Sequence, residues 1–148
     1  EGVQAELVNG ITAGLAAVTA IGVPLTHREH AHGVILITGH AKPGAAGPDW
    51  RALAATARDA KLTLVIYMGV SGAQYIQAEL LSGLSAHTPV AIIQRASLPD
   101  QRHAITTLGA LHATIAREQL ASPSVIVVGD VVRGVAAVDA DVSRRQFG

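Results

Sequence analysis

Four short apolar runs rich in β-branched residues constrain the fold of this chain more than any other feature. They are VILIT (34–38), LTLVIYM (62–68), PVAIIQ (89–94) and SVIVVG (124–129). Their length and composition are typical of strands buried on both faces. Segments with helical periodicity separate them, and this alternation predicts an α/β domain with a mostly parallel or mixed sheet flanked by helices.

The helical segments are expected where apolar residues recur with helical spacing. These segments are 10–20, 50–60, 72–83 and 108–120. Asn9, Asp49 and Ser71 are the expected N-caps of the first three, because short polar side chains accept bonds from free backbone amides. We expect one domain over 10–136, preceded by a remnant of a linker or earlier segment (1–9) and followed by a polar tail (137–148).

Composition excludes several classes of protein. Apolar residues make up 49% of the chain and charged residues 15%, which argues against disorder. Acidic and basic residues balance at 11 each and aromatic residues are only 3%, so a nucleic-acid partner is not expected. No cysteine is present to form a disulfide or a thiolate metal site. Glycines and a proline interrupt the apolar run 10–25, which favours a buried helix over a membrane span.

An open parallel sheet binds ligands beyond the carboxyl ends of its strands. Four such places are expected here, at 39–40, 68–69, 94–97 and 129–130. The small residues among them allow backbone amides to approach a ligand closely.

Four histidines cluster between positions 27 and 40. His27, His30 and His32 are spaced so that they could bind zinc or nickel, but they lie in an expected loop without helical spacing. Solvated loop histidines are the alternative for His30 and His32. His87, His103 and His112 are scattered and are assigned no function. The chain has no GxSxG elbow, GxGxxG loop or Walker A motif, so a serine nucleophile or a phosphate loop is not expected.

Several motifs occur in an order that resembles a known family. They are NGITAGLAAVTAIGVPLTHR, ILITGH, DWRALA, TLVIYMGV, TPVAIIQRAS, PDQR and SPSVIVVGDVV. Together they resemble the carboxyl-terminal half of tetrapyrrole methylases, in the branch that methylates uroporphyrinogen III. The resemblance covers roughly 10–132 and depends on the conjunction of motifs rather than on any single one.

This resemblance implies a cytoplasmic homodimer in which two α/β domains hold S-adenosylmethionine and a tetrapyrrole between them. It implies methyl transfer to C2 and C7 of uroporphyrinogen III, giving precorrin-2 for sirohaem or cobalamin synthesis. Neither a metal, a nucleic acid nor a membrane is implied. Because a sulfonium is already an activated donor, the protein mainly has to align the methyl group with a pyrrole carbon.

The resemblance also assigns candidate site residues one by one. The cofactor contacts are Thr12, Ala13, Met68, Ala96 and Ser124. The substrate contacts are His27, Arg28, His40 and again Met68. Arg28 is the first candidate for a substrate carboxylate, since a guanidinium can form paired hydrogen bonds with it. Thr12 could instead be an ordinary helix-start residue, and His27 and His40 could be solvated.

Three departures from the family pattern affect these expectations. Asn9 stands where the family usually has proline, and QRAS (94–97) replaces the more frequent ENGT. The family's amino-terminal half, with its glycine loop and the residues assigned to proton transfer, is absent from this sequence. No catalytic residue is therefore assigned, and the chain alone is expected not to methylate. The alternatives are a non-catalytic α/β ligand-binding or dimerisation module and, from the histidines alone, a metal-binding domain.

Overall fold

The structure is a computed structural model that describes residues 2–41 and 46–134. Its elements are α1 (Ala13–Ala20), β1 (Gly33–Thr38), α2 (Trp50–Asp59), β2 (Leu62–Tyr67), α3 (Ala73–Leu80), β3 (Pro89–Gln94), β4 (Arg102–Thr107), a 3-10 turn η1 (Leu108–Ala110), α4 (Leu111–Arg117), β5 (Ser124–Val128) and a second 3-10 turn η2 (Asp130–Val132). All four apolar runs are strands, as predicted.

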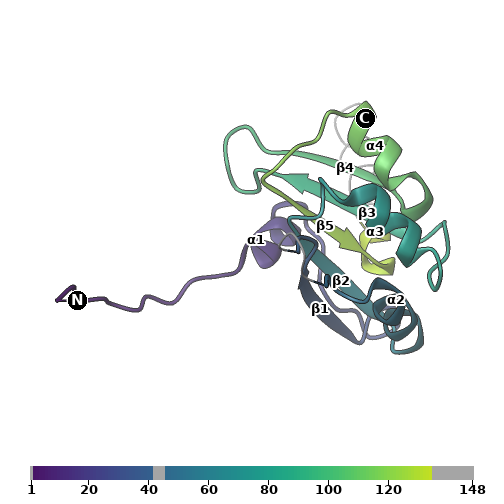
Figure 1. Cartoon of the computed structure of the whole chain (residues 1–148), viewed down its shortest axis with the longest axis horizontal. Coiled ribbons are helices and arrows are strands. Elements are labelled where there is room, and N and C mark those ends of the chain that lie inside the picture. Colours follow the sequence, from purple (N-terminus) through teal and green to yellow (C-terminus); the bar gives the residue numbers. More distant parts are fainter. Residues whose placement is uncertain (1, 42–45, 135–148) are drawn as a thin grey trace, which may run out of the picture.

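The five strands form one mixed sheet in the order β1-β2-β5-β3-β4 (Figure 1). β1 and β2 are parallel, whereas β5 is antiparallel to both β2 and β3. β1, β2 and β3 therefore run in one direction and end at the same edge of the sheet. β5 begins at that edge, because the last helix returns the chain to it. The expectation of a mostly parallel or mixed sheet is met in its mixed form.

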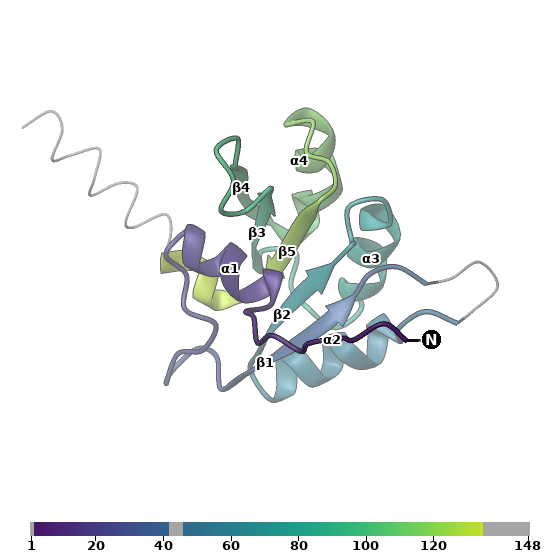
Figure 2. The same cartoon turned by 90° about the vertical axis from the view of Figure 1, so that its left-hand side faces the viewer.

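Helices cover the two faces of the sheet unequally (Figure 2). One face packs against α2, α3 and α4 through a core that includes Trp50, Leu64, Ile92 and Leu111. The other face packs against α1 and η2 through a smaller core. On that second face the outer strand β1 leaves Leu36 46% exposed.

Two helix starts differ from the sequence prediction. α1 begins at Ala13 with Thr12 as its N-cap, because the Thr12 carbonyl accepts bonds from the amides of Leu15 and Ala16. Asn9 lies before it in an extended segment that leaves the body of the molecule in Figure 1. The cap of α3 is Gly72 rather than the predicted Ser71.

The predicted cap of α2 is confirmed, since the Asp49 carboxylate accepts a 3.0 Å bond from the amide of Ala52. The strand β4 was not predicted. It pairs with β3 at the edge of the sheet, and its exposed Arg102 and His103 conceal the apolar pattern of a strand.

The predicted polar tail at 137–148 lies outside the described residues. Across the part of the chain that is described, the helices are all too short or too polar to traverse a lipid bilayer.

Candidate functional site

A cavity of about 400 Å³ opens at the edge where β2 and β3 end, and we call it the strand-end cavity. It lies between the start of α1, the ends of β2 and β3, and the residues that lead into β5. Its lining comprises Ala13, Ala16, Tyr67, Met68, Ile93, Arg95, Ala96, Leu98, Ser122, Pro123, Ser124 and Val125. The walls are mainly small or apolar, and the size is typical of a pocket for a small ligand or cofactor.

Four of the five residues assigned to cofactor binding line this cavity. Ala13, Met68, Ala96 and Ser124 reach it from four separate segments of the chain. The antiparallel direction of β5 is what brings Ser124, at the start of its strand, to the edge where the other strands end. The fifth residue, Thr12, immediately precedes the lining residue Ala13.

Tyr67 ties the start of α1 to the sheet beside the cavity. Its hydroxyl shares a hydrogen bond with the Thr12 hydroxyl and accepts a 3.2 Å bond from the amide of Gly14. Gly14 is required for this approach, because a Cβ there would lie 2.5 Å from the Tyr67 oxygen and 2.8 Å from Val65. The tyrosine thus sets the position of Thr12 and Ala13 relative to Met68.

Sharp backbone turns follow both strands that end at the cavity. Met68 after β2 and Arg95 after β3 each have a φ of +52°, in the left-handed region that non-glycine residues rarely adopt. Such conformations cost free energy and are retained where the surrounding structure enforces them, commonly at binding sites. Here they turn the chain out of the sheet, so that both residues border the cavity rather than extending their strands.

A close contact between glycines joins the ends of β1 and β2. A Cβ on Gly39 would lie 2.7 Å from the Cα of Gly69, so the TGH and YMG motifs meet at backbone distance. His40, assigned to the substrate, follows Gly39 at this same edge. Its side chain is exposed and does not line the cavity.

The sequence of the chain matches a model of one protein family. Residues 1–112 match the Tetrapyrrole (Corrin/Porphyrin) Methylases. The chain belongs to the tetrapyrrole methylase family.

Named relatives and solved structures agree with this assignment. A uroporphyrinogen-III C-methyltransferase of Pseudomonas fluorescens is 44% identical over 143 residues, which cover 96% of this chain and 56% of that protein. A sirohaem synthase of Azotobacter vinelandii is 43% identical, covering 89% of this chain and 28% of that protein. The crystal structure of uroporphyrin-III C-methyl transferase from Thermus thermophilus with S-adenosyl homocysteine matches with a TM-score of 0.71 and 34% identity, covering 89% of this chain and 55% of that one. The chain therefore spans about half the length of the methyltransferases it matches, and about a quarter of the sirohaem synthase.

In this tetrapyrrole methylase chain, the structure does not bring His27 and Arg28 to the strand-end cavity. Both lie in the loop before β1, where the amide of His32 bonds to the carbonyl of Lys61 just ahead of β2. They are thus at the opposite end of the sheet from Met68, and both side chains are exposed. Gly129–Asp130, expected at the ligand edge, also lies at this opposite end because β5 is antiparallel.

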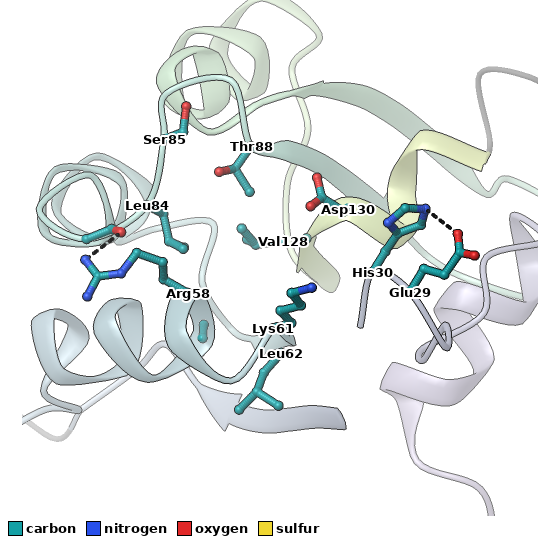
Figure 3. Close-up of a pocket in the computed structure, with 13 residues that line it drawn as sticks. Glu29, His30, Arg58, Lys61, Leu62, Leu84, Ser85, Thr88, Val128 and Asp130 are labelled. Atoms are coloured by element: carbon teal, nitrogen blue, oxygen red, sulfur yellow. Dashed lines mark hydrogen bonds and ion pairs between the residues drawn. The ribbon is translucent and has the colours of Figure 1, made fainter. Parts of the chain in front are cut away.

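A second cavity, of about 440 Å³, occupies that opposite end (Figure 3). Its lining includes Glu29 and His30 from the loop before β1, Lys61 immediately before β2, and Asp130 after β5. We call it the loop-end cavity. Its charged lining contrasts with the mainly apolar wall of the strand-end cavity.

The sequence prediction assigned four of the twelve lining residues and missed the other eight. Among these eight, Tyr67 and Leu98 lie outside every predicted ligand-binding place, whereas Arg95 lies within the predicted place 94–97 but was given no role of its own. Arg95 is paired with Asp100, with a distance of 2.7 Å between guanidinium and carboxylate. A signal existed for Tyr67, which is the single aromatic residue in the four apolar runs, and for Arg95, which departs from the family's ENGT pattern.

Proposed function

We propose that this chain is the carboxyl-terminal part of an S-adenosylmethionine-dependent uroporphyrinogen-III C-methyltransferase. The whole enzyme would methylate C2 and then C7 of uroporphyrinogen III, giving precorrin-2 for sirohaem or cobalamin synthesis. It would act in the cytoplasm as a homodimer, as the family resemblance implies.

The convergence of the assigned cofactor residues on one cavity is the observation that carries this proposal. Ala13, Met68, Ala96 and Ser124 come from distant parts of the sequence and are assigned from family motifs, and all four line the strand-end cavity. The Thermus thermophilus relative, which is 34% identical, was crystallised with S-adenosyl homocysteine.

The chemistry of the cavity fits an adenosyl cofactor. Ile93, Leu98 and Val125 offer apolar surface for the adenine ring, while Ala13 and Ala96 leave room beside it. When bound, S-adenosylmethionine supplies an activated methyl group. The residues of this chain would hold that group beside Met68, so that its bond to sulfur breaks as a bond to the pyrrole carbon forms. The family resemblance implies that residues outside this chain would assist the loss of the ring proton.

The substrate contacts form a separate part of the proposal. His40 and Met68 lie at the edge where strands β1 and β2 end, and there they could face a tetrapyrrole above the cofactor. His27 and Arg28 lie at the other end of the sheet, so a substrate bound beside Met68 would not reach them within this chain. Their assignment stays a prediction from the family motif.

A titration with S-adenosylhomocysteine tests the cofactor site. Replacing Ala96 with phenylalanine should fill the strand-end cavity and weaken S-adenosylhomocysteine binding at least about tenfold. A tenfold change in Kd corresponds to about 1.4 kcal/mol of binding free energy. Ala113→Phe on the exposed side of α4 is the matched control and should leave binding unchanged. Calorimetry measures both variants, and undiminished binding by Ala96→Phe would place the cofactor elsewhere.

A non-catalytic binding or dimerisation module is the second candidate, and one observation favours it. Arg95, paired with Asp100, lines the cavity where the family more often has a neutral residue. Methyl transfer by the whole protein that contains this chain decides between the two. Binding of S-adenosylhomocysteine without turnover by that whole protein would support the module.

A further inference from the structure

We propose that the loop before β1 binds a divalent transition metal through His27, Glu29 and His30. One ligand atom from each of the three side chains lies within 4.8 Å of the others. This set is not the His27, His30 and His32 combination suggested by spacing, since Glu29 takes the place of His32. The site lies at the opposite end of the sheet from the strand-end cavity and uses none of the residues that line that cavity, so its one overlap with the proposed function is His27, a predicted substrate contact.

A closed backbone turn holds the three residues together. The amide of His27 donates a 2.7 Å bond to the carbonyl of Ala31, and the amide of Ala31 donates a 2.9 Å bond back to the carbonyl of His27. Ala31 itself is 2% exposed and packs into the smaller core, so the turn is anchored to the sheet. The loop is therefore constrained even though the three candidate ligands are exposed.

The candidate ligand atoms, which lie within 4.8 Å of one another, are farther apart than the ligands of a bound ion, so the side chains must close around it. A tetrahedral zinc ion with ligands at about 2.1 Å separates them by about 3.4 Å. The Nε2 atom of His30 is 3.8 Å from the Glu29 carboxylate, and the rings of His27 and His30 have centroids 4.7 Å apart. One imidazole must rotate out of this stack to bind an ion, and exposed side chains have the freedom to do so.

Binding costs one weak hydrogen bond in the loop. The Nδ1 atom of His27 accepts a 3.2 Å bond from the amide of Glu29, which leaves the proton of the neutral ring on Nε2. Coordination through either nitrogen disrupts this arrangement. The loss is small, because the bond is exposed and water can accept from the amide instead.

The ligand types select the class of metal. Two imidazoles and one carboxylate suit Zn²⁺, Ni²⁺ or Cu²⁺ rather than Mg²⁺ or Ca²⁺, which prefer oxygen ligands. Water completes the coordination sphere from the side of the loop-end cavity. Figure 3 shows Lys61 and Asp130 lining that cavity beside Glu29 and His30. The positive charge of Lys61 opposes a cation, and Asp130 offsets it only in part because its carboxylate is paired with Arg133, so we expect modest affinity.

Metal titration of the protein without a histidine tag tests the site. Calorimetry with Zn²⁺ should show one ion per chain, and His30→Ala and Glu29→Gln should each weaken binding at least about tenfold. His32→Ala and His87→Ala are matched controls, since both histidines are exposed and lie outside the cluster, and they should bind as the unaltered chain does. Co²⁺ provides a second measurement, because its visible absorption reports ligation by imidazole and disappears in His30→Ala.

Three results would overturn the proposal. They are no Zn²⁺ binding by the unaltered protein, unchanged affinity in both His30→Ala and Glu29→Gln, and an equal loss in the His32→Ala control. Circular dichroism confirms that each variant is folded. A metal on His27 would also occupy the imidazole assigned to the substrate, so the two roles exclude one another at any moment.

Discussion

At the scale of single residues, the contact between Gly14 and Tyr67 fixes one wall of the strand-end cavity. A Cβ at position 14 would lie 2.5 Å from the tyrosine oxygen and 2.8 Å from buried Val65. We expect overpacking in Gly14→Ala to lower the free energy of unfolding by about 1–3 kcal/mol. The higher helix propensity of alanine should offset up to about 1 kcal/mol of this loss. It should also weaken S-adenosylhomocysteine binding, because α1 must shift. Urea denaturation and calorimetry measure the two effects.

Gly10→Ala is the control for this change, because a Cβ at position 10 meets nothing within 4 Å. Equal stability of the two variants would show that α1 adjusts without strain.

Single residues also show what could and could not be predicted from the sequence. Motif resemblance assigned Met68 and Ala96, which line the cavity, but it did not point to Tyr67, whose hydroxyl accepts a hydrogen bond from Gly14, 53 residues earlier in the chain. Nor could the motif that ends in PLTHR (24–28) reveal that His27 and Arg28 lie at the far end of the sheet.

At the scale of elements, an ion pair links helices α2 and α3. Arg51 donates bonds of 2.8 and 3.1 Å to the carboxylate of Glu79. The hydrogen bond from Arg51, aided by its charge and opposed by desolvation, lowers the pKa of Glu79 below its ordinary value. A lowered pKa means that the pair stabilises the fold at neutral pH, and that this contribution is lost as the pH falls through the folded-state pKa.

We expect Glu79→Gln to be slightly less stable than the unaltered chain at neutral pH and equally stable in acid. The effect is small because Arg51 is largely exposed and water screens the pair. Urea denaturation from neutral pH into the acid range measures the difference in stability, with Glu6→Gln in the extended segment as control. A difference that persists unchanged in acid would mean that Glu79 acts through packing instead.

The elements also show which parts of the fold were accessible from sequence. Apolar composition located β1, β2, β3 and β5, because buried strands carry an unbroken apolar signal. Only β2, β3 and β5 are buried, whereas β1 is an edge strand whose alternate residues are exposed, which the same apolar pattern did not reveal. Nor could apolar composition give the direction of β5, since a strand buried on both faces has the same pattern in a parallel or an antiparallel neighbour. That direction is what brings Ser124 to the strand-end cavity and sends Asp130 away from it.

At the scale of the whole molecule, the strand-end cavity is bordered by apolar side chains that remain in contact with solvent. Met68 is 58% exposed and Leu98 is 47% exposed. Methyl transfer requires the donor and the acceptor to be held in a fixed geometry from which water is excluded. The chain spans about half the length of its methyltransferase relatives, and its described residues leave Met68 and Leu98 open to solvent.

We therefore expect the purified chain to bind S-adenosylhomocysteine weakly and to show no turnover of uroporphyrinogen III. In the longer methyltransferase that we propose, the affinity should be higher, because the family's other half would cover Met68 and Leu98. Calorimetry measures the affinity, and transfer of radiolabelled methyl groups measures turnover. If the other half packs on Leu98, then Leu98→Ser should weaken S-adenosylhomocysteine binding in the longer protein more than it does in the chain alone. Steady turnover by the chain alone would mean that the residues lining its own cavity suffice for the reaction.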